Sequence, residues 1–142
     1  MIKNERQYKI TKSQIKKFDA ALGALVARDD ADAGARLRKL EEDALRSQLD
    51  ELRDEVEAYE QLRSGRREPI AIESFDQLPR ALVQARIVAG LSQKELAERL
   101  GLKEQQIQRY EATDYSSASL TRLKEIAEAL GASITGEMTY SP

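Results

Sequence analysis

The sequence predicts a mainly α-helical protein built in two parts, and three observations support this prediction. The N-terminal part is rich in Ala, Leu, Glu, Arg and Gln with apolar residues at helical spacing; the C-terminal part breaks into short amphipathic stretches; and a Gly- and Pro-containing segment separates the two. We therefore expect an N-terminal helical hairpin or coiled-coil segment at 1–64, a linker at 65–75, a bundle of four to five helices at 76–131, and a C-terminal β-strand or tail at 132–142.

Composition narrows the functions open to the chain. Its 142 residues include 23 Lys and Arg against 25 Asp and Glu, for a net charge of −2, with no Cys and no His. The commonest metal ligand, the commonest general base and any thiolate nucleophile are therefore missing. We expect no enzyme, no catalytic residue, no metal and no cofactor. Because the first residues are polar and no stretch approaches 18 apolar residues, we expect a cytoplasmic protein without a membrane partner.

The first helix is predicted to begin at a capping box. Thr11 stands three residues before Gln14, the spacing at which each side chain can cap a backbone N–H of the other. The helix should run from about Lys12 until the Asp-rich run at 28–33 breaks it. The apolar residues that recur along it at spacings of three and four are Ile15, Phe18, Leu22 and Leu25.

A longer helix is predicted from about Ala33 to Arg63. Its apolar stripe keeps heptad spacing at Leu45, Leu49, Leu52, Val56 and Tyr59, preceded in a shifted phase by Leu37, Leu40 and Ala44. Two partners remain open for this stripe: the first helix of the same chain, or another chain in a coiled coil. A helix of about 30 residues is about 45 Å long, against about 17 residues in the first, so a hairpin cannot cover it all. We therefore expect a homodimer.

The C-terminal tail carries the pattern of a β-strand. Ile134, Gly136, Met138 and Tyr140 alternate with polar residues. Since a lone strand is not stable, we expect this one to pair with residues 70–72 or with a second subunit.

Four short helices are predicted between residues 76 and 131. The fourth should bury Leu120, Leu123, Ile126, Ala127 and Leu130. The boundaries are marked by Asp76, Pro79 and Gly90 for the first helix, by the capping box Ser92-Gln93-Lys94-Glu95 and Gly101 for the second, by residues 103–110 for the third, and by Ser119 and Gly131 for the fourth.

Within this bundle, residues 93–113, QKELAERLGLKEQQIQRYEAT, resemble the helix-turn-helix of the phage-repressor or XRE family. Ala97 is small where the two helices of the motif cross, and Gly101 can adopt the left-handed backbone of the turn. The apolar core of the motif is supplied by Leu96, Leu100, Leu102, Ile107 and Tyr110. The resemblance covers about 55 residues. It implies a phage-repressor-like DNA-binding domain in a transcription regulator, a repressor that binds double-stranded DNA as a dimer.

The resemblance also implies roles for individual residues. Base edges would be read by Glu104, Gln105, Gln106 and Arg109, although the same residues would suit a plain solvated helix face. Phosphate contacts are expected from Ser92, Gln93, Lys94, Lys103 and Tyr115, the first three at a helix N-terminus. Arg86 and Glu111 match positions that form a structural ion pair in the family.

Two considerations work against a simple repressor. Residues 69–142 hold eight basic and ten acidic side chains, so the predicted DNA-binding part has a net charge of −2 and needs a localised positive patch. A helix-turn-helix can also survive as a pure interaction domain. The layout of a small repressor domain beside a charged helical segment resembles HigA-type antitoxins. The alternative function is therefore an antitoxin that binds a toxin protein and represses its own operon.

Overall fold

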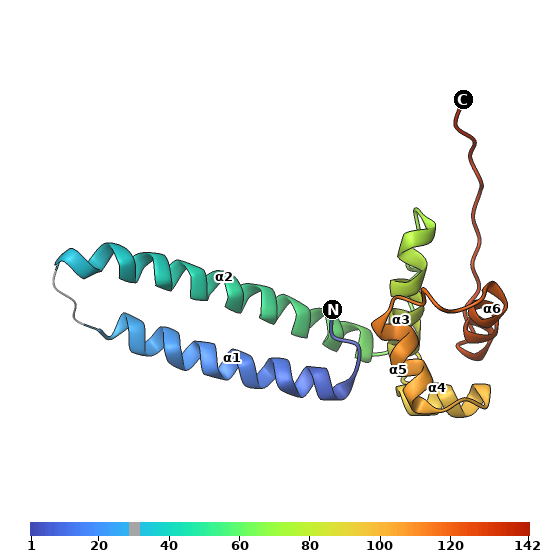
Figure 1. The fold of residues 1–142 in the computed structure, drawn as a ribbon, viewed down its shortest axis with the longest axis horizontal. Helices are drawn as coiled ribbons and strands as arrows, with labels where there is room; N and C mark the ends of the chain where they lie inside the picture. Colours follow the sequence, from blue (N-terminus) through green and yellow to red (C-terminus); the bar gives the residue numbers. More distant parts are fainter. Residues whose placement is uncertain (29–31) are drawn as a thin grey trace. The chain divides into compact units, whose positions relative to one another are not determined.

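The computed structural model of the chain describes residues 1–28 and 32–142, which form two compact units, 1–64 and 65–142. The predicted break at 28–33 falls partly outside the described residues. None of the described helices is long and apolar enough to cross a lipid bilayer. In chain order, the described part holds α1 (Glu5–Val26), α2 (Asp32–Arg63), the short 3₁₀ helix η1 (Phe75–Gln77), α3 (Leu78–Val88), α4 (Gln93–Leu100), α5 (Glu104–Ala112) and α6 (Leu120–Ala129) (Figure 1).

In the first unit, α1 and α2 lie side by side as an antiparallel hairpin (Figure 1). α1 begins about two turns earlier than predicted, because Asn4 caps it by accepting a hydrogen bond from the backbone N–H of Gln7. The predicted capping box at Thr11 is therefore wrong. Thr11 lies inside the helix, nearly buried, and its hydroxyl donates to the carbonyl of Gln7 at 3.0 Å.

The heptad stripe of α2 faces α1, as one of the two alternatives predicted. Leu49, Val56 and Tyr59 are buried in the hairpin. At the open end of the hairpin, Tyr8 packs on Tyr59 with ring centroids 5.3 Å apart, and its hydroxyl donates to the Glu60 carboxylate. This hydrogen bond raises the pKa of Tyr8 above its ordinary value. Aromatic packing and polar contacts thus fasten the two helix ends together.

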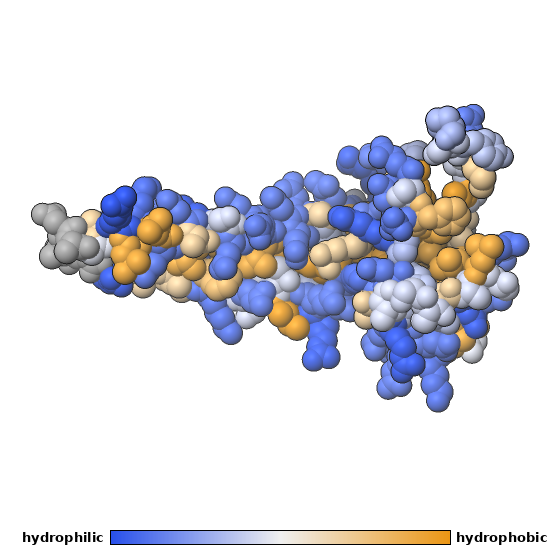
Figure 2. All heavy atoms as spheres, turned by 45° about the horizontal axis from the view of Figure 1, so that its top comes forward, coloured by the Kyte–Doolittle hydropathy of each residue, from blue (hydrophilic) through white to orange (hydrophobic). Residues whose placement is uncertain are grey.

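The shifted phase near the start of α2 leaves apolar side chains uncovered. Leu37 and Leu40 are 60% and 63% exposed, because a helix of 3.6 residues per turn turns them away from the α1-facing stripe. Val26, at the end of α1, is also exposed. Figure 2 shows apolar surface at this end of the hairpin, beside the residues drawn in grey. We call Val26, Leu37 and Leu40 the hairpin-turn apolar surface.

In the second unit, helices α3 to α6 enclose a small core. Its most deeply buried side chains include Leu82, Leu96, Ile107 and Ile126. Ser119 caps α6 as predicted. Two details of the prediction are wrong. Asp76 lies inside η1, and α3 starts without a side-chain cap. Leu120 is 68% exposed, because it occupies the first position of α6, on the side away from the core.

The predicted C-terminal β-strand is not found. Among the described residues there is no β-strand, and residues 132–142 run on from α6 without a ladder (Figure 1). A strand needs a hydrogen-bonded neighbour, and residues 70–72 do not supply one to this tail. Ile134, Met138 and Tyr140 consequently stay exposed.

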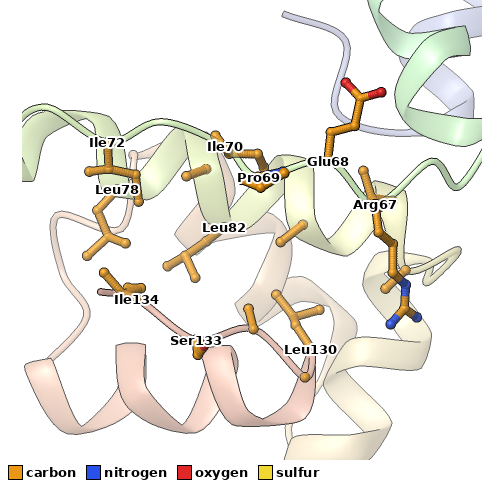
Figure 3. Close-up of a pocket in the computed structure, with 16 residues that line it drawn as sticks. Arg67, Glu68, Pro69, Ile70, Ile72, Leu78, Leu82, Leu130, Ser133 and Ile134 are labelled. Carbon is orange, nitrogen blue, oxygen red and sulfur yellow. The ribbon is translucent and has the colours of Figure 1, made fainter. Parts of the chain in front are cut away.

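Residues 67–72 and the start of the tail instead border an apolar pocket of about 470 Å³ within the second unit. Figure 3 shows side chains from the two segments, from α3 and from the end of α6 turned toward this space, namely Ile70, Ile72, Leu78, Leu82, Leu130 and Ile134. The segment predicted as a linker is therefore in part a wall of the second unit.

Candidate nucleic-acid interface

The turn between α4 and α5 has the geometry of a tight helix-turn-helix. Ser92 and Glu95 form a reciprocal capping box at the start of α4, as predicted. Gly101 ends α4 in the left-handed conformation, with φ of 67°, which glycine adopts without a steric penalty. The N–H of Leu102 then donates to the carbonyl of Ala97 at 2.8 Å. Ala97 is only 1% exposed, so its small side chain lets α5 approach α4 closely.

Gln105 and Arg109 lie on the exposed face of α5. Both side chains are exposed, and they are four residues apart on the same side of the helix. Among the described residues, neither side chain forms a hydrogen bond or an ion pair. Their hydrogen-bonding groups are therefore free to meet a ligand.

The two other predicted base-reading residues are engaged within α5. Gln106 is half-buried, and its Nε2 donates to the hydroxyl of Tyr110 at 3.2 Å. Glu104 accepts a hydrogen bond from Gln108 at 3.2 Å on the exposed surface. A contact from Gln106 to DNA would first have to give up a bond inside the domain, so the four positions are not equivalent.

The predicted phosphate-binding residues also differ in whether their side chains are available to a ligand. Lys94 and Lys103 are exposed, and no ion pair engages either within the described chain. The Ser92 side chain is occupied by the capping box. In that box the backbone N–H of Ser92 donates to the Glu95 carboxylate, which lowers the pKa of Glu95 below its ordinary value. The first turn of α4 therefore offers Lys94 as its exposed cation.

Gln93 points into the domain. It is 7% exposed, and its Nε2 donates to Oε2 of Glu111 at 2.7 Å. Only its backbone, at the N-terminus of α4, is placed to approach a phosphate. Sequence reasoning missed this inward role, because the position after a capping serine is usually on the surface and Glu111 is 18 residues away.

Arg86 and Glu111 form a bidentate ion pair between α3 and α5. Arg86 Nε lies 2.5 Å from Glu111 Oε1, and Nη2 lies 2.9 Å from Oε2. Arg86 Nη1 also donates to the carbonyl of Leu91 at 2.8 Å. The two side chains are 3% and 1% exposed. Together with Gln93, this network ties α3, the start of α4 and α5 into one unit, beneath the surface that would meet DNA.

Tyr115 is buried, although the sequence placed it at the phosphate backbone. It is 4% exposed and stacks on Tyr110 with ring centroids 5.8 Å apart. Burial raises the pKa of its hydroxyl, which has no hydrogen-bond partner among the described residues. Asp114 and Tyr115 both have positive φ, so the loop backbone turns the ring inward. This residue therefore contributes to the core and offers no group at the surface.

A further residue that the sequence did not single out is Arg99. It is exposed on α4, and its Nη1 donates to the carbonyl of Ala129 at 3.0 Å, which joins α4 to the end of α6. A cation near the last carbonyls of a helix is favourable. No local sequence signal marks a contact across 30 residues.

Comparison with known proteins agrees with this geometry. Residues 82–136 match a protein family described as helix-turn-helix. No curated protein and no solved structure matches the chain significantly. The matched range includes α4, the Gly101 turn and α5, and it carries the reciprocal cap and the close helix crossing described above. Residues 82–136 are thus a helix-turn-helix domain of the XRE family, the domain of a DNA-binding transcription regulator.

Proposed function

We propose that the chain is a sequence-specific repressor that binds double-stranded DNA as a dimer, with α5 in the major groove. The observation that supports this most directly is the pair Gln105 and Arg109, which are exposed on one face of α5 and have no partner within the described chain. In a helix-turn-helix, the second helix of the motif reads base edges.

The chemistry of the two side chains suits that role. A glutamine amide can donate to and accept from adenine at once, and an arginine can place two donors on guanine. One helical turn, about 5.4 Å of rise, separates them, so they can address different base pairs. Lys94 and Lys103 would contact phosphates, which orient the domain without reading sequence.

The test is selection of bound sequences from random duplex DNA, followed by affinity measurements on single-base variants of the selected site. Gln105→Ala and Arg109→Ala should each flatten the preference at a distinct base position, by about 1 to 3 kcal/mol. Lys94→Ala should weaken binding to all sequences about equally. If the α5 variants lose affinity uniformly, or not at all, α5 does not read bases as proposed.

Dimerisation rests on the hairpin-turn apolar surface. Burying the exposed part of Leu37 and Leu40 against a second copy would contribute about 1 to 2 kcal/mol for each side chain. Leu37→Gln with Leu40→Gln should therefore weaken the dimer by at least about 100-fold, measured as molar mass by light scattering across concentration. Leu120→Gln, which changes an equally exposed leucine in the other unit, should leave the mass unchanged. A wild-type monomer on operator DNA would contradict the dimer.

The antitoxin alternative draws on the same surface, because exposed leucines suit a different protein equally well. It predicts a monomeric chain that forms a stable complex with the product of an adjacent reading frame. Co-expression of the two followed by mass measurement separates this outcome from a homodimer.

A further inference from the structure

The outer surface of α1 carries an unusual concentration of positive charge. The helix contains five basic and two acidic residues. All five basic side chains are exposed, and they lie within twelve consecutive residues. We call them the α1 basic face: Arg6, Lys9, Lys12, Lys16 and Lys17.

In the part of the chain that the structure describes, ion pairs with α2 neutralise the acidic residues of α1 but not its basic residues. Both acidic residues of α1 are engaged by arginines of α2, Glu5 by Arg63 at 3.1 Å and Asp19 by Arg53 at 2.7 Å. The basic residues of α1 have no such compensation, since none of the five forms an ion pair within the described residues. Lys12 alone has a specific contact, over the ring of Tyr8. The hairpin therefore neutralises the anions of α1 and leaves its cations unneutralised.

Helical geometry gathers these cations on the side away from α2. At 3.6 residues per turn, the α1 residues packed against α2 share one face, and all five basic positions lie about 90° or more from its centre. Arg6 and Lys17 are eleven residues apart, which corresponds to about 16 Å along the axis. One DNA strand presents a phosphate about every 3.4 Å of helix axis, so the face spans several phosphates.

We propose that the α1 basic face is an accessory site for the phosphate backbone of DNA. This inference rests on the proposed function, because the partner is the DNA that the helix-turn-helix domain holds. The domain has no net positive charge to attract phosphates, since residues 65–142 contain ten basic and eleven acidic residues. The covalent link to the domain raises the effective concentration of the basic face near bound DNA.

The test compares two full-length triple variants with equal changes in charge. Lys9→Gln, Lys16→Gln and Lys17→Gln remove three cations of the α1 basic face and spare the Lys12 contact with Tyr8. The control, Arg36→Gln, Lys39→Gln and Arg46→Gln, removes three exposed cations from α2. Two of these, Lys39 and Arg46, already pair with acids one turn away. Both variants are checked by circular dichroism and by molar mass.

Affinity is measured by fluorescence anisotropy between 50 and 200 mM salt, on the selected operator and on a random-sequence duplex. Each phosphate contact contributes about 0.9 to the slope of log affinity against log salt. The α1 variant should flatten the slope by about 2.7, so the loss of affinity across this salt range becomes about 40-fold smaller on both duplexes. The α2 control should keep the wild-type slope.

Three results would overturn the proposal: an unchanged slope in the α1 variant, an equal change in the α2 control, or a loss of affinity that follows a drop in molar mass. The last would assign the basic face to a contact with a second copy of the chain. The two proposals fail separately. If the α1 variant flattens the salt slope but the chain shows no sequence preference, only the repressor function is contradicted. If base reading is intact but the α1 variant keeps the wild-type slope, only the accessory site is contradicted.

Discussion

Replacing Arg86 with alanine should destabilise the helix-turn-helix unit far more than it alters DNA contact. Arg86 donates to both oxygens of Glu111 and to the carbonyl of Leu91, and the pair is almost completely excluded from solvent. Truncation would leave the Glu111 carboxylate buried without the guanidinium that neutralises it, although Gln93 still donates to it at 2.7 Å. Breaking a buried pair from one side costs about 3 to 5 kcal/mol.

This cost is large on the scale of the unit. A domain of about 80 residues unfolds with a free energy of about 4 to 12 kcal/mol, and each kcal/mol shifts its melting temperature by about 4 to 8 °C. Arg86→Ala should therefore lower the melting temperature of residues 65–142 by roughly 15 °C or more. Arg86→Lys should recover only part of the loss, since an ammonium cannot donate in the bidentate geometry.

Circular dichroism melts of the full chain provide the measurement, with DNA affinity measured well below the transition. Arg122→Ala is the matched control, because Arg122 pairs with Glu125 at 2.8 Å on a more exposed surface. Its cost should stay below about 1 kcal/mol. An Arg86→Ala protein with an unchanged melting temperature and lost DNA binding would refute the structural role and make Arg86 a DNA contact.

Three further predictions follow from the same unit. Tyr115→Phe should raise the free energy of unfolding by about 1 kcal/mol and leave DNA affinity unchanged, because it removes a buried hydroxyl without a partner among the described residues; weaker binding would restore Tyr115 as a phosphate contact. Glu95 has a lowered pKa in the folded chain, so its stabilisation is complete above the ordinary value of 4.5 and is lost as the pH falls through the lower folded value. Melts of wild type and Glu95→Gln should therefore differ near neutral pH and converge as the pH falls below 4.5, whereas a constant difference would contradict this linkage. Deleting residues 1–64 should leave a folded unit that selects the same DNA sequence, since its core is closed by its own side chains; an altered preference, measured by the same selection, would make the hairpin part of the reading surface.

The elements that the sequence predicted well are those determined by neighbouring residues. The capping box at Ser92 and Glu95, the left-handed Gly101 and the cap at Ser119 each depend on groups within three or four positions, and all three are present. The start of α1 was misplaced because two caps compete locally. Thr11 suits an N-cap, but Asn4 comes earlier, and the helix that it starts also packs Tyr8 on Tyr59 of α2.

The C-terminal tail shows a second reason why a sequence pattern can fail to predict structure. Alternation of apolar and polar residues describes a strand only when another backbone completes its hydrogen bonds. In residues 132–142 the alternation is present, and the neighbouring residues 70–72 meet the start of the tail across an apolar pocket, without a ladder. A sequence pattern can thus specify which side chains are apolar without specifying the partner that would order them.

Charge shows most clearly why the candidate surface could be predicted only in part. Counting charges in the sequence gives a nearly neutral hairpin and a slightly acidic domain, which argues against a nucleic-acid partner. In the folded chain, some of these charges are paired between residues that are far apart in the sequence. Examples are Arg53 with Asp19, 34 residues apart, and Arg86 with Glu111, 25 residues apart. These contacts use arginines to neutralise acids, and they leave Lys9, Lys16 and Lys17 unneutralised on α1. Because attraction to phosphate depends on local cations, and charges beyond about 8 Å are screened at physiological salt, the net charge of this chain is a poor guide to its partner.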